Sequence, residues 1–285
     1  MPDGLRAVSG SSDRSLKEWE LDADPPIGLS NDRFCLQTLF GHLRRVLCVA
    51  ALGENRVASG SVFNEAALKI WSLAEGVCLQ TVRPSTFDVK SIAVLSEGRV
   101  AVAGGNTMID IWDFSGTEGR CVKTMEAPHP ESDTFDDSIS CVAALPNDRV
   151  ATCSYEAIQV CDISKGRCVQ TTDLGGKCEG DNRANCVAAS PDDGRVFVGY
   201  DDDNGIDSTL ELLDLTTGAF HSLPGINTAV FSLAILSDTR LISGTGSCDL
   251  TVWIDRPREI ERAIATQLAR QRLVVDVAKC VTKFV

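Results

Sequence analysis

The sequence predicts an all-β fold that is built from repeated four-stranded units. A CxxT tetrapeptide begins at Cys35, Cys78, Cys121 and Cys168, at intervals of 43, 43 and 47 residues. Within each interval short extended segments follow one another in the same order, with turns of Gly, Asn, Asp or Ser between them. A fixed period of this length indicates a repeat architecture, in which each unit is one small supersecondary structure.

The unit that starts at Cys35 predicts four strands in order. The CLQTL segment comes first and is followed, after a loop, by the apolar run from Val46 to Leu52. This run is apolar on both faces, which is typical of a strand that is buried from both sides. The segments 56–60 and 68–71 are short, rich in branched side chains and bounded by turn residues, so we expect them to be strands as well.

Three segments then resemble the WD40 repeat. They are SGSSDRSLKEW (9–19), ASGSVFNEAALKIW (58–71) and ISGTGSCDLTVW (242–253), and Gly41-His42 precedes the Val46 run as the family's Gly-His does. The resemblance extends to about Asp255 and implies a β-propeller of about six four-stranded blades. The strand-c tryptophan position of the six blades is held by Trp19, Trp71, Trp112, Cys161, Leu213 and Trp253.

The resemblance also implies a hydrogen-bonded brace in each blade. In the family it links a loop His, a strand-b Ser or Thr, a turn Asp and the strand-c Trp. The matching residues here are Asp13, Trp19, His42, Ser59, Trp71, Trp112, Asp207 and Trp253. Glu65 stands where the second blade should have its Asp. Because the fourth and fifth blades lack most of these groups, we expect them to be the softest, each missing hydrogen bond forgoing about 1 kcal/mol.

Residues 1–285 are expected to form a single propeller, with residues 256–285 as a C-terminal closing segment. Leu5 to Ser9 already has the character of a strand b, so the first blade lacks an inner strand, and Leu273–Ala278 resembles one. A strand there would remove two open sheet edges. A helix is the alternative, because Ile260, Ile264 and Leu268 recur every four residues.

Composition points to a cytoplasmic protein, with the nucleus left open. The net charge is −13, which argues against binding to nucleic acid or to an anionic membrane surface. No run of 18 apolar residues is present. The twelve cysteines show no C-x-x-C spacing and recur in register with the repeats, so we expect reduced thiols that act as small apolar groups, without disulfides.

The chain offers little that points to catalysis, and we expect it not to be an enzyme. Its three histidines have no Cys, Asp or Glu at ligand spacing, and no nucleophile elbow or phosphate-binding loop is present. A partial calcium-loop pattern runs from Tyr200 to Glu211, but Tyr200 occupies the first ligand position, where a carboxylate is required. We therefore expect no metal, no cofactor and no small-molecule substrate.

Acidic residues gather in three long loops that a WD40 blade would place on one face. The loops span 126–138, 173–184 and 201–208, and they hold twelve acids and two bases. The candidate partner-binding residues in them are Glu131, Asp133, Asp136, Asp137, Glu179, Asp181, Asp201, Asp202 and Asp203. They indicate either a dock for a basic peptide or domain or a surface that only keeps the protein soluble.

The leading hypothesis is a non-catalytic scaffold or adaptor that binds other proteins. One form of it is the substrate-recognition subunit of a ubiquitin ligase complex. The rival class is a propeller enzyme with a central-channel site, which would need convergent polar side chains at the inner strands. Those strands are almost wholly apolar, as in VLCVAAL and SCVAALP.

Overall fold

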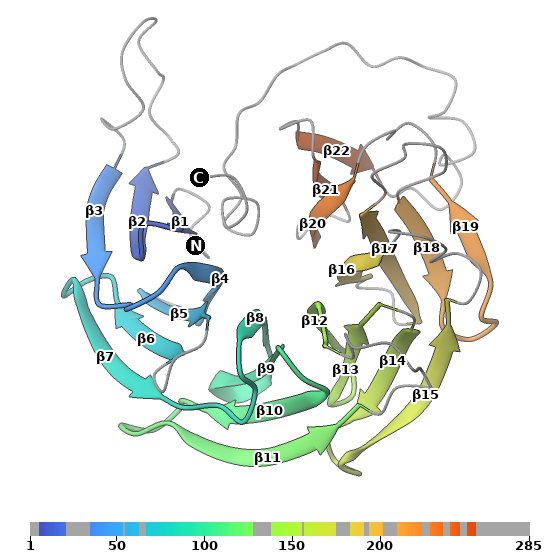
Figure 1. Ribbon diagram of the computed structural model, residues 1–285, viewed down its shortest axis with the longest axis horizontal. Coiled ribbons are helices and arrows are strands. Elements are labelled where there is room, and N and C mark those ends of the chain that lie inside the picture. Colours follow the sequence, from blue (N-terminus) through green and yellow to red (C-terminus); the bar gives the residue numbers. More distant parts are fainter. Residues whose placement is uncertain are drawn as a thin grey trace, which may run out of the picture. The chain divides into compact units, whose positions relative to one another are not determined.

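The computed structural model is all-β, with six antiparallel sheets and one short 3-10 turn in the part of the chain that it describes (Figure 1). The described residues are 6–20, 35–53, 55–62, 67–127, 138–155, 157–174, 183–190, 194–201, 210–223, 229–235, 240–245 and 250–254. The chain divides into two compact units, the first ending at Ala127 and the second beginning at Pro128. This repeated-strand architecture fits a β-propeller.

The first unit contains three sheets whose strands follow one another along the chain. The first sheet is β1 (Arg6–Gly10), β2 (Ser15–Glu20) and β3 (Cys35–Phe40). The second is β4 (Val46–Ala51), β5 (Arg56–Ser61), β6 (Leu68–Ser72) and β7 (Val77–Val82). The third is β8 (Val89–Val94), β9 (Arg99–Gly104), β10 (Met108–Asp113) and β11 (Arg120–Glu126), with the 3-10 turn η2 (Ser96–Gly98) between β8 and β9.

The second unit repeats the same strand order. Its first sheet is β12 (Cys141–Leu145), β13 (Arg149–Cys153), β14 (Ala157–Asp162) and β15 (Arg167–Asp173). The next is β16 (Arg183–Ala189), β17 (Arg195–Asp201), β18 (Leu210–Asp214) and β19 (Phe220–Ser222). The last is β20 (Val230–Ile235), β21 (Arg240–Thr245) and β22 (Leu250–Ile254). The segment 256–285 lies outside the described residues, so the closing segment and the single 1–285 domain stay predictions.

Burial in a four-stranded sheet is greatest in the two central strands and least in the last strand. In the second sheet the five residues of β6 are all buried, whereas buried residues are missing from β7 and half-exposed ones alternate with exposed ones. Only a strand that is covered on both faces can bury every side chain, as β6 does. The core therefore lies along the central strands of each four-stranded sheet.

Neighbouring sheets approach each other closely at a glycine that recurs near the end of β1, β5 and β17. A Cβ atom on Gly10, Gly60 or Gly199 would lie too close to the first valine of the next inner strand, which is Val46, Val89 or Val230 respectively. The thiols nearby add a contact of the same kind: Cys48 Sγ donates to the Val89 carbonyl at 3.4 Å, and Cys186 Sγ to the Val230 carbonyl at 3.5 Å. Small residues at these positions allow the sheets to pack.

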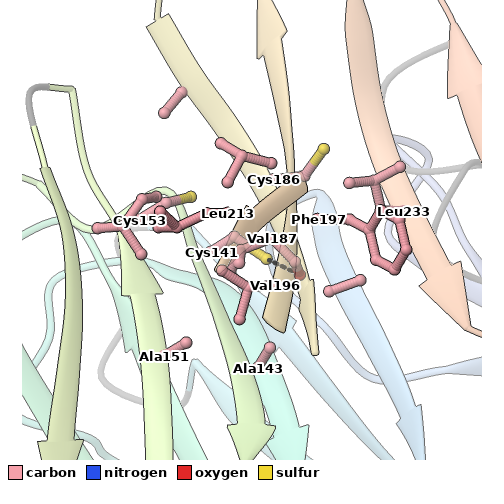
Figure 2. Close-up of a cluster of buried hydrophobic side chains, with 14 of the residues drawn as sticks. Cys141, Ala143, Ala151, Cys153, Cys186, Val187, Val196, Phe197, Leu213 and Leu233 are labelled. Atoms are coloured by element: carbon pink, nitrogen blue, oxygen red, sulfur yellow. Dashed lines mark hydrogen bonds between the residues drawn. The ribbon is translucent and has the colours of Figure 1, made fainter. Parts of the chain in front are cut away.

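The core of the second unit is one contiguous apolar cluster. Figure 2 shows Cys141 and Cys153, which pair across β12 and β13, in the same cluster as Phe197 and Leu233. The Cys141 thiol donates to the Val187 carbonyl at 3.6 Å. The hydrogen bond with Cys141, followed by burial, raises the pKa of the Cys153 thiol well above its usual range. The Cys153 thiol therefore stays protonated, and both thiols pack as small apolar groups.

Candidate functional site

The 40–45 loop (Phe40–Arg45), which leads from β3 to β4, is tied to the second sheet by a buried brace. His42 Nε2 lies 2.6 Å from Ser59 Oγ, and Trp71 Nε1 donates to the same oxygen at 2.8 Å. All three side chains are buried. Gly41 adopts a φ of +155°, and a side chain there would approach the Trp71 ring at 3.1 Å. The loop backbone is thus held against β5 and β6.

His42 is neutral in this position. Burial, with a smaller effect from the Lys69 charge, lowers the pKa of His42 from its ordinary 6.5 to about 4. A neutral imidazole and the Ser59 hydroxyl can share one hydrogen bond without a buried charge. The brace therefore depends on the deprotonated form of His42.

The first sheet keeps part of the same arrangement. Trp19 Nε1 donates to Ser9 Oγ at 2.8 Å. The Asp13 carboxylate accepts from the Ser15 hydroxyl at 2.6 Å and from the Ser15 backbone amide at 2.8 Å, and the hydroxyl contact lowers the pKa of Asp13. Asp13 thus closes the β1–β2 turn, whereas Ser9 holds the indole.

Trp112 differs from the other two tryptophans. Its buried indole N–H has no hydrogen-bond partner. The cause is the residue on the neighbouring strand, since Val102 pairs with Asp110 as Ser59 pairs with Lys69 and so occupies the Ser59 position. The ring instead stacks on Phe114, with centroids 6.1 Å apart. Trp112 therefore contributes packing rather than a hydrogen-bonded brace.

The remaining positions of the predicted braces are Trp253, Asp207 and Glu65. Trp253 lies on β22, where the structure describes the strand but not its side chains. Asp207 and Glu65 lie outside the described residues.

The register explains why CxxT recurs. In each of four sheets the CxxT cysteine pairs across the outer strands with the tryptophan position, next to a β-bulge; the pairs are Trp19–Cys35, Trp71–Cys78, Trp112–Cys121 and Cys161–Cys168. The threonine faces a polar residue two positions before the tryptophan. Lys69 Nζ donates to Thr81 Oγ1 at 2.7 Å, and Thr124 Oγ1 donates to Asp110 at 2.7 Å. The motif therefore belongs to a repeated cross-strand contact.

The prediction that all cysteines are free is wrong for one pair. Cys161 and Cys168 form a disulfide between β14 and β15. Cys161 stands at the tryptophan position and Cys168 opens CVQT, so the shared register sets two sulfurs opposite each other. The sequence shows them only as residues seven apart, and their pairing depends on the strand register and the bulge at Val160.

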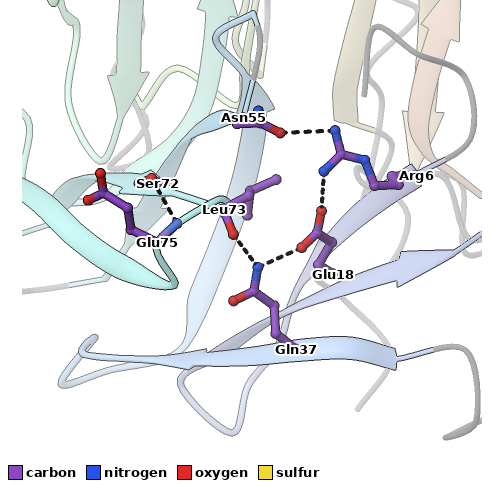
Figure 3. Close-up of polar contacts among 7 residues, drawn as sticks. All are labelled: Arg6, Glu18, Gln37, Asn55, Ser72, Leu73 and Glu75. Atoms are coloured by element: carbon purple, nitrogen blue, oxygen red, sulfur yellow. Dashed lines mark hydrogen bonds and ion pairs between the residues drawn. The ribbon is translucent and has the colours of Figure 1, made fainter.

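In the CLQT and CVQT segments the third residue is a glutamine, and its side-chain amide contacts the next sheet. Gln37 Nε2 donates to the Leu73 carbonyl and to Glu18, both at 2.6 Å. Figure 3 shows how Arg6 extends this network, donating to Glu18 at 2.8 Å and to Asn55 at 3.0 Å. The first and second sheets are therefore joined by a polar network around the buried carboxylate of Glu18.

The glutamine at this position also reaches a backbone carbonyl of the next sheet in two other cases. Gln80 donates to the Thr117 carbonyl at 2.9 Å, and Gln170 donates to the Leu215 carbonyl at 2.7 Å. These glutamines were read from the sequence only as parts of extended segments. Their recurrence at a fixed place in CLQT and CVQT was the signal that could have revealed the contact.

The predicted acidic docking loops fall almost entirely outside the described residues. Of the nine candidate acids only Asp201 is described, at the end of β17, where it pairs in register with Arg183. Glu131, Asp133, Asp136, Asp137, Glu179, Asp181, Asp202 and Asp203 lie outside. The acidic face therefore stays a prediction.

The Glu211 carboxylate is hydrogen-bonded within its own sheet. Glu211, the last position of the partial calcium pattern, accepts from Tyr200 at 2.9 Å and from Ser222 at 3.1 Å.

Within the described ranges, His, Cys, Asp and Glu form no group of three that could hold a metal ion. None of the described segments is a helix with the length and apolarity needed to span a membrane.

A feature missed in the sequence lies on two loops of the first unit. Phe40 and Leu43 in the 40–45 loop are 75% and 68% exposed, although the His42 side chain between them is buried. Phe87, in the loop between β7 and β8, is 66% exposed. The sequence FGHL offered a signal, because a buried histidine flanked by large apolar residues forces those residues outward.

Comparison with known proteins gives one short match. A stretch of 77 residues, 26% of the chain, is 38% identical to a CCR4-associated factor 4 homolog of Candida glabrata. The match spans 13% of that protein's length. No family model matches the chain.

Proposed function

We propose that the chain is a non-catalytic, cytoplasmic protein-binding platform on a WD40-type propeller of about six blades. The observation that supports it most is the 40–45 loop, which exposes Phe40 and Leu43 on a backbone held by the His42–Ser59–Trp71 brace. Large apolar side chains that are exposed on a rigid element lose little conformational entropy when a partner covers them. Interaction sites are commonly built in this way.

Two further observations favour the same class of function. Glu18, Asp110 and Glu211 accept hydrogen bonds inside the sheets, so these carboxylates serve structure. The relative in Candida glabrata is named as a homolog of a CCR4-associated factor, and we propose that this chain likewise associates with another protein. The acidic loops, Asp201 among them, would add a dock for a basic segment.

Site-specific photo-cross-linking in cell extract tests the proposal. A photoreactive phenylalanine analogue replaces Leu43 in one variant and Leu79 in a matched control; Leu79 is 45% exposed on β7. We expect discrete protein adducts from position 43 and few from position 79. Equal adducts from both positions, or none from position 43, would contradict the proposal.

A further inference from the structure

Two arginines stand beside the exposed apolar side chains of the 40–45 loop. Arg44 and Arg45 are both exposed. Among the described residues no carboxylate forms an ion pair with either guanidinium. The loop thus offers apolar surface and unpaired positive charge on one short segment.

The neighbouring loops extend this surface. In the first unit the 11–14, 83–88 and 105–107 loops lie on the same side of the sheets as the 40–45 loop, because every sheet repeats one strand order. Contacts agree with this, since the Val46 amide donates to the Ser11 carbonyl and the Gly105 amide to the Asp88 carbonyl. The 83–88 loop is itself held in place, because Ser85 donates from both its amide and its hydroxyl to Asp110.

The charge of these loops is opposite to that of the chain. Together the described loops carry four arginines and two aspartates, a formal charge of +2; they are Arg14, Arg44, Arg45, Arg83, Asp13 and Asp88. The whole chain carries −13. The positive charge of Arg44 and Arg45 beside the exposed Leu43 disfavours a basic ligand and favours an acidic one.

We infer that the 40–45 loop docks an acidic protein segment that carries aliphatic or aromatic side chains. The apolar side chains of the segment cover Phe40 and Leu43, and its carboxylates pair with Arg44 and Arg45. This inference rests on the proposed function and adds the chemistry of the partner. It concerns a surface of opposite charge to the acidic loops.

Fluorescence anisotropy of the full chain tests this with three labelled peptides. In the first, Asp and Glu alternate with Leu and Phe; in the second, Lys and Arg replace the acids; in the third, Ser replaces the apolar residues. We expect only the first to bind, more weakly as salt is added, because exposed ion pairs are screened. Joint Arg44→Glu and Arg45→Glu substitution should weaken its binding about tenfold or more.

Matched controls separate docking from folding. Leu43→Ser removes an apolar contact and should also weaken binding of the first peptide. Its control is Leu79→Ser on β7, and the control for the arginines is Arg167→Glu, at an exposed arginine on β15. Both controls should bind like the wild type, and all variants should keep its melting temperature.

Three outcomes would overturn the inference. They are unchanged binding by the double arginine variant, equal binding of the basic peptide, and self-association in sedimentation velocity that the double variant abolishes, which would make a second copy the occupant. Protein adducts at position 43 without peptide binding would leave the proposed function standing with a partner of other chemistry.

Discussion

In the sheet β4–β7 the residue opposite the CxxT cysteine is Trp71, whereas in the sheet β12–β15 it is Cys161. Trp71 fills its site with a large ring and reaches Ser59 and, through it, His42. Cys161 is equally buried but is joined to the outer strand by a covalent bond to Cys168. One backbone register therefore accepts two different ways of fixing an outer strand.

The hydrogen-bonded brace and the disulfide fix different parts of their sheets. The hydrogen-bonded brace includes a residue of the loop before the sheet, so it fixes the 40–45 loop as well as the strands. The disulfide joins β14 to β15 only. We therefore expect breaks in the brace to affect loop and sheet together, and reduction of the disulfide to affect the strand pair alone.

The largest effect is expected from Trp71→Ala. The substitution removes a ring that is 1% exposed, together with the indole N–H that donates to Ser59. Deletion of a large buried aromatic costs about 3–5 kcal/mol. Chemical denaturation measures the free energy of unfolding, and a value equal to that of the wild type would show that Trp71 is not part of the core.

Acid should weaken the brace next. Because the pKa of His42 is about 4 when folded and 6.5 ordinarily, the unfolded chain takes up the proton first as the pH falls. The free energy of unfolding therefore decreases between pH 6.5 and 4, by about 3 kcal/mol from this group at most. Denaturation across this range should show a smaller decrease in His42→Asn. An identical decrease in both proteins would rule out this cause.

Reduction should have a smaller effect, confined to the other sheet. The disulfide closes a loop with a sequence separation of 7, for which the chain-entropy model gives about 2 kcal/mol. Adding a reductant should lower the stability of the wild type by that amount and leave Cys168→Ser unchanged. Alkylation and mass spectrometry should first find two cysteines protected. Twelve accessible thiols in unfolded protein would restore the sequence-based prediction of free cysteines.

The smallest effect concerns Trp112. Val102→Thr places a hydroxyl where Ser59 stands in the second sheet, so it should offer the unpaired indole N–H an acceptor. We expect stability within about 0.5 kcal/mol of the wild type, because the hydrogen bond offsets the buried hydroxyl. Val100→Thr, equally buried on the same strand, should lose about 1–2 kcal/mol. Equal losses of stability in the two variants would contradict the conclusion that residue 102 faces the indole N–H of Trp112.

The sequence predicted the strands closely. The segments expected at 46–52, 56–60 and 68–71 are β4 at Val46–Ala51, β5 at Arg56–Ser61 and β6 at Leu68–Ser72. Such boundaries follow from local apolar pattern and turn residues. The His42–Ser59–Trp71 contact was implied by resemblance to a known repeat.

The remaining features depend on relations between strands, which local pattern does not encode. The Cys161–Cys168 disulfide arises from a bulged pairing, and the unpaired Trp112 indole arises from a valine on another strand. The exposure of Phe40 and Leu43 follows from the inward turn of His42 between them. Each of these features can be predicted only when the pairing of the strands or the path of the loop is known.

Hydrogen exchange with a partner recovered by cross-linking at position 43 tests the central claim most directly. The claim is that the braced 40–45 loop is a docking surface. Without the partner, the amides of this loop should already exchange slowly for a connecting segment, because the brace holds them. With it, protection should rise at 40–45 and 83–88 and stay unchanged over β14 and β15. Fast exchange without the partner, or new protection only at β14 and β15, would contradict the account.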